Sequence, residues 1–361
     1  MFKNKRFMTF IIMSVLISIG LLMVFSSSYI WAEYKFNDSF KYLKQQAIFV
    51  IIGYIVIYFI LKLNSDFFYK HSNKFLLLGF LFLILVLIPG IGTVRNGSRS
   101  WFGIGPFGVQ PSEAMKLLII IFVSKYLSNN KKAYQSLKGI FPPLGVTFLA
   151  FALIMLEPDL GTGFILTLSV LALLFITGVK IKYFYGLGII GIIGIIILII
   201  IAPYRLDRIT SYINPWSDPL GTGFQIIQSL YAIGPGGLLG FGLFNSKQKH
   251  FYLPEPQTDF IFSIICEELG VFGAALVIIL FALLAFYIIK IALEQEDLFK
   301  KYVIFGLGFQ IIFQAILNTS VITGILPITG ITLPFISYGG SSLLVTMTSI
   351  GIILNLSKNN K

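Results

Sequence analysis

Carboxylates stand at the ends of several long apolar segments in this chain. Asp259 follows a polar stretch at 252–258 and comes directly before an apolar run. A carboxylate that faces a cleft at this position can act as a general base. A helix cap is the plainer interpretation, because a carboxylate at a helix N-terminus binds free backbone N–H groups. Glu267 and Glu268, about two turns further along, are expected to pack in polar contacts between helices.

Another acidic residue has a basic neighbour. Glu113 and Lys116 are three residues apart, so they share one face of a helix that begins near Pro111. Ionisable groups inside a membrane segment cost about 2.5–3.5 kcal/mol each on insertion scales, which makes both residues candidates for function. Two interpretations stay open: a structural ion pair that joins helices, or an outward-facing polar site that holds part of an anionic substrate.

Two further motifs contain groups that could bind ions. Glu157 and Asp159 flank a proline before an apolar segment, where they can form a solvated turn that caps a helix or can bind a divalent cation. Ser337 belongs to the Gly- and Ser-rich motif at 334–342, whose backbone N–H groups could cradle an anion. A helix start with close backbone packing explains this motif nearly as well.

The composition indicates what kind of element must position these groups. The chain has 361 residues, of which 57% are apolar and 12% are charged, whereas a soluble domain has about 25% charged residues. Many apolar runs approach the ~20 residues that cross a bilayer as a helix. A soluble enzyme and a disordered protein are therefore excluded, and the single cysteine, Cys266, excludes a disulfide scaffold.

The pattern predicts an all-α polytopic membrane protein with ten transmembrane helices in a single domain over 1–361. Most of the 27 Lys and Arg residues lie in loops on the side that holds both termini, which places both termini in the cytoplasm. They form no basic stripe, so no nucleic-acid partner is expected. Most acids lie on the opposite side, which indicates chemistry at the outer face. The predicted spans are 7–30, 45–62, 75–92, 112–128, 141–156, 161–178, 183–202, 260–289, 303–326 and 335–356.

One connection is far longer than the others. Residues 203–259, between the seventh and eighth spans, form a large extracytoplasmic loop without a predicted spanning helix. The loop is rich in Gly, Pro and aromatic residues and poor in charge, which argues against disorder. A short amphipathic or re-entrant helix is expected at 221–233. His71 is expected in a cytoplasmic loop.

Several motifs, in order along nearly the whole chain, resemble those of the SEDS proteins (shape, elongation, division and sporulation), the family of FtsW, RodA and SpoVE. The spellings are more similar to the FtsW/SpoVE branch than to RodA. The motifs are QPSE at 110–113 with Lys116, EPDLGT at 157–162, NPWSDPLGTGFQ at 214–225, QSL at 228–230, YLPEPQTDFIF at 252–262 and PFISYGGSS at 334–342.

The resemblance implies a peptidoglycan glycosyltransferase of the bacterial inner membrane. Such proteins polymerise lipid II and work with a class B penicillin-binding protein, and other divisome membrane proteins are expected partners. The essential loop aspartate of the family maps onto Asp259, and its fourth-helix acid and base map onto Glu113 and Lys116. Many members have His where this chain has Gln257, which removes an imidazole from that position but leaves the carboxylate.

The resulting hypothesis is that Asp259 takes the proton of an acceptor sugar hydroxyl while undecaprenyl pyrophosphate leaves. The leaving group needs fixed cations or a metal. Lys116 and Arg99 are the first candidate cations. The predicted substrate-binding set also contains Glu113, Glu157, Asp159, Ser337 and two further basic residues. Those two are Arg205 and Lys249, with Arg208 and Lys247 also on the outer side.

Two other functions use the same features. A lipid II flippase would need the same buried charges and cleft without making a bond, and a non-catalytic division scaffold would need neither. No tightly bound cofactor is expected, and the sequence leaves open a divalent cation, magnesium or manganese, with unknown ligands.

Overall fold

Long apolar helices make up most of the computed structural model, which describes residues 4–95, 97–103, 108–130, 136–201, 206 and 210–358. Each of the ten predicted segments overlaps one of these helices. They are α1 (Lys5–Phe36), α2 (Lys41–Lys62), α3 (Asp66–Leu87), α4 (Pro111–Asn129), α5 (Leu137–Leu156), α6 (Leu160–Ile176), α7 (Ile181–Ile201), α10 (Ile261–Leu293), α11 (Leu298–Ile322) and α12 (Gly340–Leu356).

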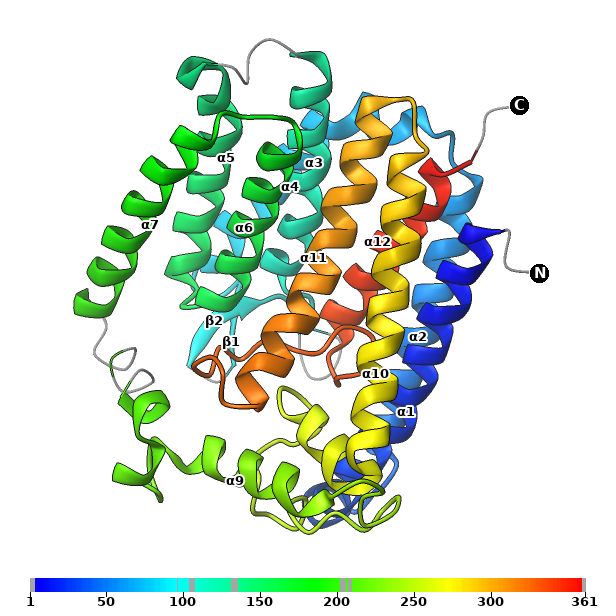
Figure 1. The fold of residues 1–361 in the computed structure, drawn as a ribbon, viewed down its shortest axis with the longest axis vertical. Helices are drawn as coiled ribbons and strands as arrows, with labels where there is room; N and C mark the ends of the chain where they lie inside the picture. The colour runs from blue at the N-terminus through cyan, green and yellow to red at the C-terminus, as the bar shows by residue number, and fades with distance from the viewer. Residues whose placement is uncertain are drawn as a thin grey trace.

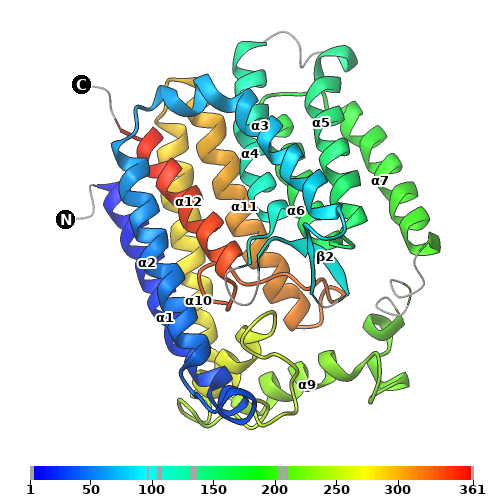
Figure 2. The ribbon, with the colours of Figure 1, turned by 180° about the vertical axis from the view of Figure 1, so that it is seen from behind.

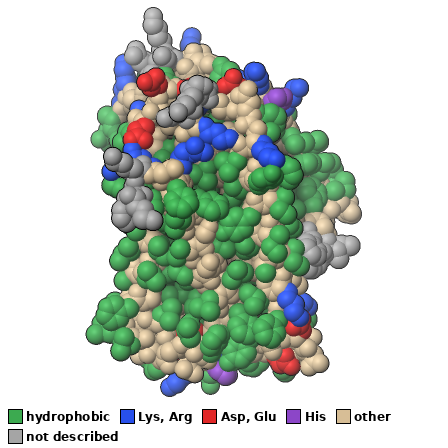
Figure 3. Space-filling view, turned by 90° about the vertical axis from the view of Figure 1, so that its right-hand side faces the viewer, with side chains coloured by type: hydrophobic (Ala, Val, Ile, Leu, Met, Phe, Trp, Pro, Cys, Tyr) green, Lys and Arg blue, Asp and Glu red, His purple; other side chains and the backbone are tan. Residues whose placement is uncertain are grey.

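The helices have the lengths and surfaces of a membrane protein. In the described part of the chain, six of them are long and apolar enough to cross a bilayer: α1, α2, α3, α5, α10 and α11. Large apolar side chains remain exposed on their outer faces, where lipid rather than water is the suitable solvent. Figure 3 shows these side chains over the middle of one face, with Lys and Arg gathered towards its upper end. The fold is therefore an all-α polytopic membrane protein, and ten crossings stay a prediction.

Helix α11 occupies the centre of the bundle. It contacts α4, α6, α10 and α12, and it lies between these helices in both ribbon views (Figures 1 and 2). Helix α7 stands at the opposite extreme, at the edge of the bundle, with a series of exposed isoleucines. A residue on α11 can therefore bridge several elements, whereas α7 faces lipid.

Helix α10 contains a break that the sequence pattern did not predict. Gly270 has φ 64° and ψ −159° inside the helix, a conformation that glycine adopts without steric cost. The backbone groups that the break releases bond to the glycine-rich part of the long loop. The N–H of Phe241 donates to Glu267 O at 2.9 Å, and the N–H of Val271 donates to Gly237 O at 3.0 Å. The loop is thus joined to α10 by backbone hydrogen bonds.

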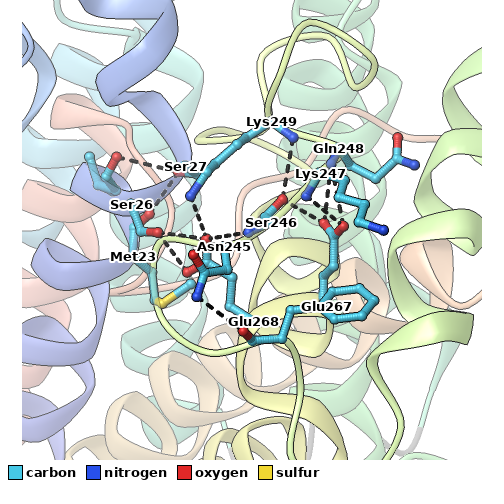
Figure 4. A network of polar contacts seen from close by, with 12 residues as sticks. Met23, Ser26, Ser27, Asn245, Ser246, Lys247, Gln248, Lys249, Glu267 and Glu268 are labelled. Atoms are coloured by element: carbon cyan, nitrogen blue, oxygen red, sulfur yellow. Dashed lines mark hydrogen bonds and ion pairs between the residues drawn. The ribbon is translucent and has the colours of Figure 1, made fainter.

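Buried charges reinforce this junction (Figure 4). Lys249 Nζ lies 2.8 Å from Glu268 Oε1, with both side chains fully buried, and the Ser26 hydroxyl of α1 donates to the same carboxylate. The Ser246 hydroxyl donates to Glu267 Oε2 at 2.5 Å. A buried charge is tolerated only when it is paired and hydrogen-bonded. The expected polar packing of Glu267 and Glu268 is confirmed.

The long loop also contains the expected short helix. Helix α9 (Phe224–Ile233) buries Ile226, Ile227, Ser229 and Ala232, which confirms the amphipathic interpretation of 221–233. The Ser229 hydroxyl contacts Ser263 Oγ at 2.8 Å and donates to Ile322 O at 2.9 Å. These bonds dock α9 on the ends of α10 and α11. Short 3-10 turns at Pro215–Ser217 (η3) and Gly234–Gly236 (η4) flank α9.

Two features near α3 differ from the predictions. Helix α3 begins at Asp66 rather than at 75, so His71 lies on a helix, with Nδ1 3.0 Å from Phe67 O; the loop assignment of His71 was wrong because polar residues continue the helix beyond its apolar stretch. After α3 a small antiparallel hairpin forms from β1 (Thr93–Arg95) and β2 (Ser98–Trp101). No strand was expected in this connection between the third and fourth predicted spans.

Candidate active site

A cavity of about 820 Å³ lies at the end of the bundle where the hairpin and the long loop meet the helices. It brings together three of the predicted carboxylates: Glu113 from α4, Asp159 from the turn between α5 and α6, and Asp259 from the loop before α10. The polar and charged lining comprises Lys41, Tyr42, Gln45, Arg95, Ser98, Ser100, Gln110, Glu113, Asp159, Thr162, Glu255, Thr258, Asp259, Thr329, Thr332, Tyr338 and Ser342.

Asp259 reaches this cavity from a loop that is held from behind. Its backbone carbonyl accepts a hydrogen bond of 2.8 Å from Asn318 Nδ2 on α11. Helix α10 begins at Ile261 with Phe260 as its N-cap residue, so Asp259 stands one residue before the cap position. The carboxylate lines the cavity, where it can meet a substrate hydroxyl.

Glu113 and Lys116 form the predicted ion pair, with Lys116 Nζ 3.0 Å from Glu113 Oε1 and both side chains buried. Glu113 lines the cavity, whereas Lys116 is not among the lining residues. Instead, Lys116 Nζ also donates to Gln314 Oε1 on α11 at 2.9 Å. The pair therefore joins helices and at the same time presents a carboxylate to the cavity.

Glu157 and Asp159 lie in different environments. Asp159 caps α6, because its Oδ1 accepts from Thr162 N at 3.0 Å, and its Oδ2 accepts from Gln110 Nε2 at 2.8 Å. Glu157 is fully buried. Burial, and then the charge of Asp159, raise the pKa of Glu157 to about 8. The Ser112 hydroxyl opposes this rise in pKa, although it forms no hydrogen bond of ordinary geometry with the carboxylate.

These two carboxylates do not fit a divalent cation site. The Glu157 oxygens are buried away from the cavity, and both Asp159 oxygens already accept hydrogen bonds. In the described part of the chain no three His, Cys, Asp or Glu side chains are grouped as metal ligands.

Among the residues that the structure describes, the cations on the cavity wall are not the ones that the sequence favoured. Arg95 and Lys41 line the cavity. The Arg95 guanidinium stacks over Trp101, with Cζ 4.7 Å from the ring centroid. A Cβ on Gly108 would lie 2.3 Å from Arg95 Nη2, so the glycine backbone supports the guanidinium from another side. Arg95 was missed because its importance depends on a hairpin that was not predicted.

Arg99 is close in sequence but lies on the other face of the hairpin. Side chains alternate along a strand, and Ser98 and Ser100, on either side of Arg99, both line the cavity. Arg99 pairs with Val94 in the strand register, and its half-buried side chain is not among the lining residues. The structure does not bring Arg99 to the carboxylates.

The remaining predicted residues are placed as follows. Lys249 is buried in the ion pair with Glu268, apart from the cavity. Ser337 is buried, and its hydroxyl accepts a hydrogen bond of 2.8 Å from Leu333 N. Arg205 lies outside the described residues, as does Arg208.

Three backbone N–H groups of the motif at 334–342 are hydrogen-bonded within the protein. The N–H of Tyr338 donates to Gln257 O at 2.8 Å, and the N–H of Gly339 donates to Gln46 Oε1 at 3.3 Å. The N–H of Ser337 is also used, by Leu333 O at 3.0 Å. The anion-cradle interpretation is wrong for these three N–H groups because protein acceptors already bind them.

The fold and the cavity define a polytopic membrane protein with a charged site at one end of a helix bundle. The chain matches the family described as "Cell cycle protein", that of FtsW, RodA and SpoVE, over residues 6–361, and it belongs to that family. The resemblance found in the sequence motifs is confirmed.

Relatives of this chain are similar over nearly their whole length. Stage V sporulation protein E of Bacillus subtilis is 51% identical over 352 residues, which cover 97% of this chain and 96% of that protein. A probable peptidoglycan glycosyltransferase FtsW of Legionella pneumophila is 39% identical over 351 residues, which cover 96% and 89%.

Solved structures share the fold. A chain from a peptidoglycan synthase complex, described for its coordination of polymerization and crosslinking, superposes with a TM-score of 0.81 at 27% identity, covering 97% of this chain and 96% of that one. The rod shape determining protein RodA of Thermus thermophilus superposes with a TM-score of 0.71 at 24% identity, covering 97% and 95%.

Proposed function

We propose that this protein is a peptidoglycan glycosyltransferase that polymerises lipid II into glycan strands and releases undecaprenyl pyrophosphate. The observation that carries the proposal is the placement of Asp259 in one cavity with two cations, Arg95 and Lys41. A base and a cationic region in the same cavity are what this transfer requires. Relatives named as probable peptidoglycan glycosyltransferases support the proposal.

The base acts on the acceptor. A sugar hydroxyl is a poor nucleophile near neutral pH, so its proton must pass to a base as its oxygen attacks the anomeric carbon of the donor. A free Asp has a pKa of about 3.9 and is ionised at that pH. Asp259 receives the proton, and general-base help of this kind contributes roughly 10²–10⁴-fold.

The cations act on the leaving group. As the bond between the anomeric carbon and the pyrophosphate oxygen breaks, negative charge collects on the pyrophosphate. Preorganised positive groups stabilise such charge most where water is excluded. Within the described part of the chain, Arg95 and Lys41 line the cavity and can do this, in place of Lys116 and Arg99. Lys116 instead holds Glu113 in the wall.

The membrane setting follows from the same proposal. Both termini lie in the cytoplasm, all ten helices span the inner membrane of a bacterium, and the cavity opens at the outer face. Figures 1 and 2 show the start of α1 and the end of α12 in the upper part of the molecule, away from α9, as expected when both termini lie on one side of the membrane.

The partners are proposed from the same relatives. Similarity to a chain of a peptidoglycan synthase complex supports a class B penicillin-binding protein that crosslinks the glycan. The 51% identity to a sporulation protein supports a role in the FtsW/SpoVE branch, with other divisome membrane proteins as partners. A divalent cation, magnesium or manganese, stays a prediction without assigned ligands.

One experiment separates the enzyme from a flippase and from a scaffold. The purified protein, with its transpeptidase partner, is given lipid II in detergent, where no translocation is needed, and glycan length is measured. The enzyme makes polymer, which is lost in Asp259→Ala and kept in Glu296→Gln, a change of an exposed carboxylate that does not line the cavity. Translocation of lipid II without any polymer would support the flippase. Growth that is complemented by Asp259→Ala would support the scaffold.

A further inference from the structure

The segment 329–332, between α11 and α12, forms a wall of the cavity beside the candidate base. Its four residues all line the cavity. A Cβ on Gly330, which has φ +70°, would lie 3.7 Å from Asp259 Oδ2, so the backbone of this wall segment is in contact range of the carboxylate. The position of Asp259 therefore depends on what holds the wall segment.

One amide holds both sides together. Asn318 on α11 is buried, with 2% of its surface exposed. Its Nδ2 donates one hydrogen bond to Asp259 O at 2.8 Å and another to Ile331 O at 2.7 Å. Both amide hydrogens are thus used, and they tie the backbone of Asp259 to the wall segment.

A second amide, one turn earlier on α11, continues the connection. Gln314 Nε2 donates to Thr332 O at 3.0 Å, and Gln314 Oε1 accepts from Lys116 Nζ at 2.9 Å. Lys116 in turn pairs with Glu113 at 3.0 Å. Gln314 and Asn318 are four residues apart, so they lie on one face of α11. Their side-chain amides can therefore bind the consecutive backbone carbonyls of Ile331 and Thr332.

The series of contacts therefore runs from Glu113 on α4 to Asp259 before α10. Its two central residues, Gln314 and Asn318, both lie on α11. We propose that Gln314 and Asn318 are positioning residues, which set the Asp259 carboxylate at a fixed place relative to Glu113 by holding the wall segment between them. This inference rests on the proposed glycosyltransferase function. Misplacement of a reacting group by about 1 Å can cost 10²-fold in rate, so a rigid support of this kind has a measurable effect.

The chain offers a matched control for Asn318. Asn355 on α12 is also buried, and its Nδ2 donates to two carbonyls, Ile60 O at 2.8 Å and Leu63 O at 2.9 Å. These acceptors lie at the cytoplasmic end of α2 in the proposed orientation, away from the cavity. Asn318→Leu and Asn355→Leu remove the same pair of amide-to-carbonyl bonds, one beside Asp259 and the other remote from it.

The test measures kcat and KM for lipid II polymerisation together with thermal stability in detergent. We expect Asn318→Leu to lower kcat about 10- to 100-fold with little change in KM, and Asn355→Leu to lose similar stability with kcat within about twofold of wild type. Gln314→Met, which keeps the side-chain length, is expected to lower kcat about 10-fold and serves where Asn318→Leu does not fold.

Equal loss of kcat in the Asn318 and Asn355 variants at equal stability would overturn the inference, as would wild-type kcat in Asn318→Leu or, in its place, in Gln314→Met. A wild-type protein that makes no polymer with its partner would instead remove the proposed function, and the positioning role with it. The polymerisation activity of the wild-type protein alone therefore distinguishes the two failures.

Discussion

The Arg95 guanidinium lies over the Trp101 ring, with Cζ 4.7 Å from the ring centroid, and both side chains line the cavity. Stacking on an aromatic face restrains a guanidinium while its N–H groups stay directed at an anion. The hairpin therefore supplies a fixed cation to a site whose base comes from a loop more than a hundred and fifty residues away along the chain.

We expect Arg95→Gln to lower kcat for lipid II polymerisation about 10²-fold, because a preorganised charge on the leaving pyrophosphate is lost. The kcat of Arg95→Lys should lie between those of Arg95→Gln and wild type, since an ammonium group neither stacks on a ring as a plane nor donates two parallel hydrogen bonds. Lys247→Gln removes an exposed outer-side charge that does not line the cavity and serves as the control. Equal rates for Arg95→Gln and Lys247→Gln would contradict this role.

Gly108→Ala should reproduce part of the Arg95 defect without changing any charge. The added Cβ would lie 2.3 Å from Arg95 Nη2, so the guanidinium has to move off its place beside Trp101. We expect a loss in kcat of about 10-fold. Gly188→Ala, where a Cβ meets nothing within 4 Å, should leave kcat unchanged, and an unchanged Gly108→Ala enzyme would show that the guanidinium position is unimportant.

Stability should fall with rising pH because of Glu157. Burial raises the pKa of Glu157 to about 8, above the value of about 4.3 expected in an unfolded chain. The folded state therefore holds a proton that the unfolded state has lost, and its contribution to stability disappears as pH rises through about 8. The melting temperature of the wild type in detergent should fall between pH 5 and pH 9 relative to Glu157→Gln. Parallel curves for the two proteins would contradict the buried, protonated carboxyl.

Lys249 should matter for folding rather than for substrate binding. Lys249→Met leaves the buried Glu268 carboxylate without its cation, which costs about 3–5 kcal/mol in comparable buried pairs. The double variant Lys249→Met with Glu268→Gln should recover part of the lost melting temperature. Folded Lys249→Met protein should keep the wild-type KM for lipid II, and a raised KM would return Lys249 to the substrate-binding set.

Much of the scaffold could be predicted because it depends on local patterns. Long apolar runs with charged ends specify helices almost regardless of their neighbours, and the three-residue spacing of Glu113 and Lys116 fixes their pairing on α4. Asp159 and Asp259, both expected on one side of the membrane, line the same cavity.

What the sequence did not reveal depends on contacts between distant segments. The strands that carry Arg95 and Arg99 are three and four residues long, too short to show a reliable alternation, so the two arginines could not be assigned to opposite faces. Glu157 and Asp159 are two residues apart, yet only packing around the turn decides that one is buried and the other lines the cavity. The break at Gly270 is likewise specified by its bonds to the long loop.

The rate of glycan polymerisation by Asp259→Asn, compared with wild type on lipid II in detergent with the partner present, tests the central claim most directly. The asparagine keeps the shape of the side chain but replaces the charged carboxylate by a neutral amide, which cannot take the proton. We expect the rate to fall by at least about 10²-fold at unchanged melting temperature. Glycan made by Asp259→Asn at the wild-type rate would contradict the account.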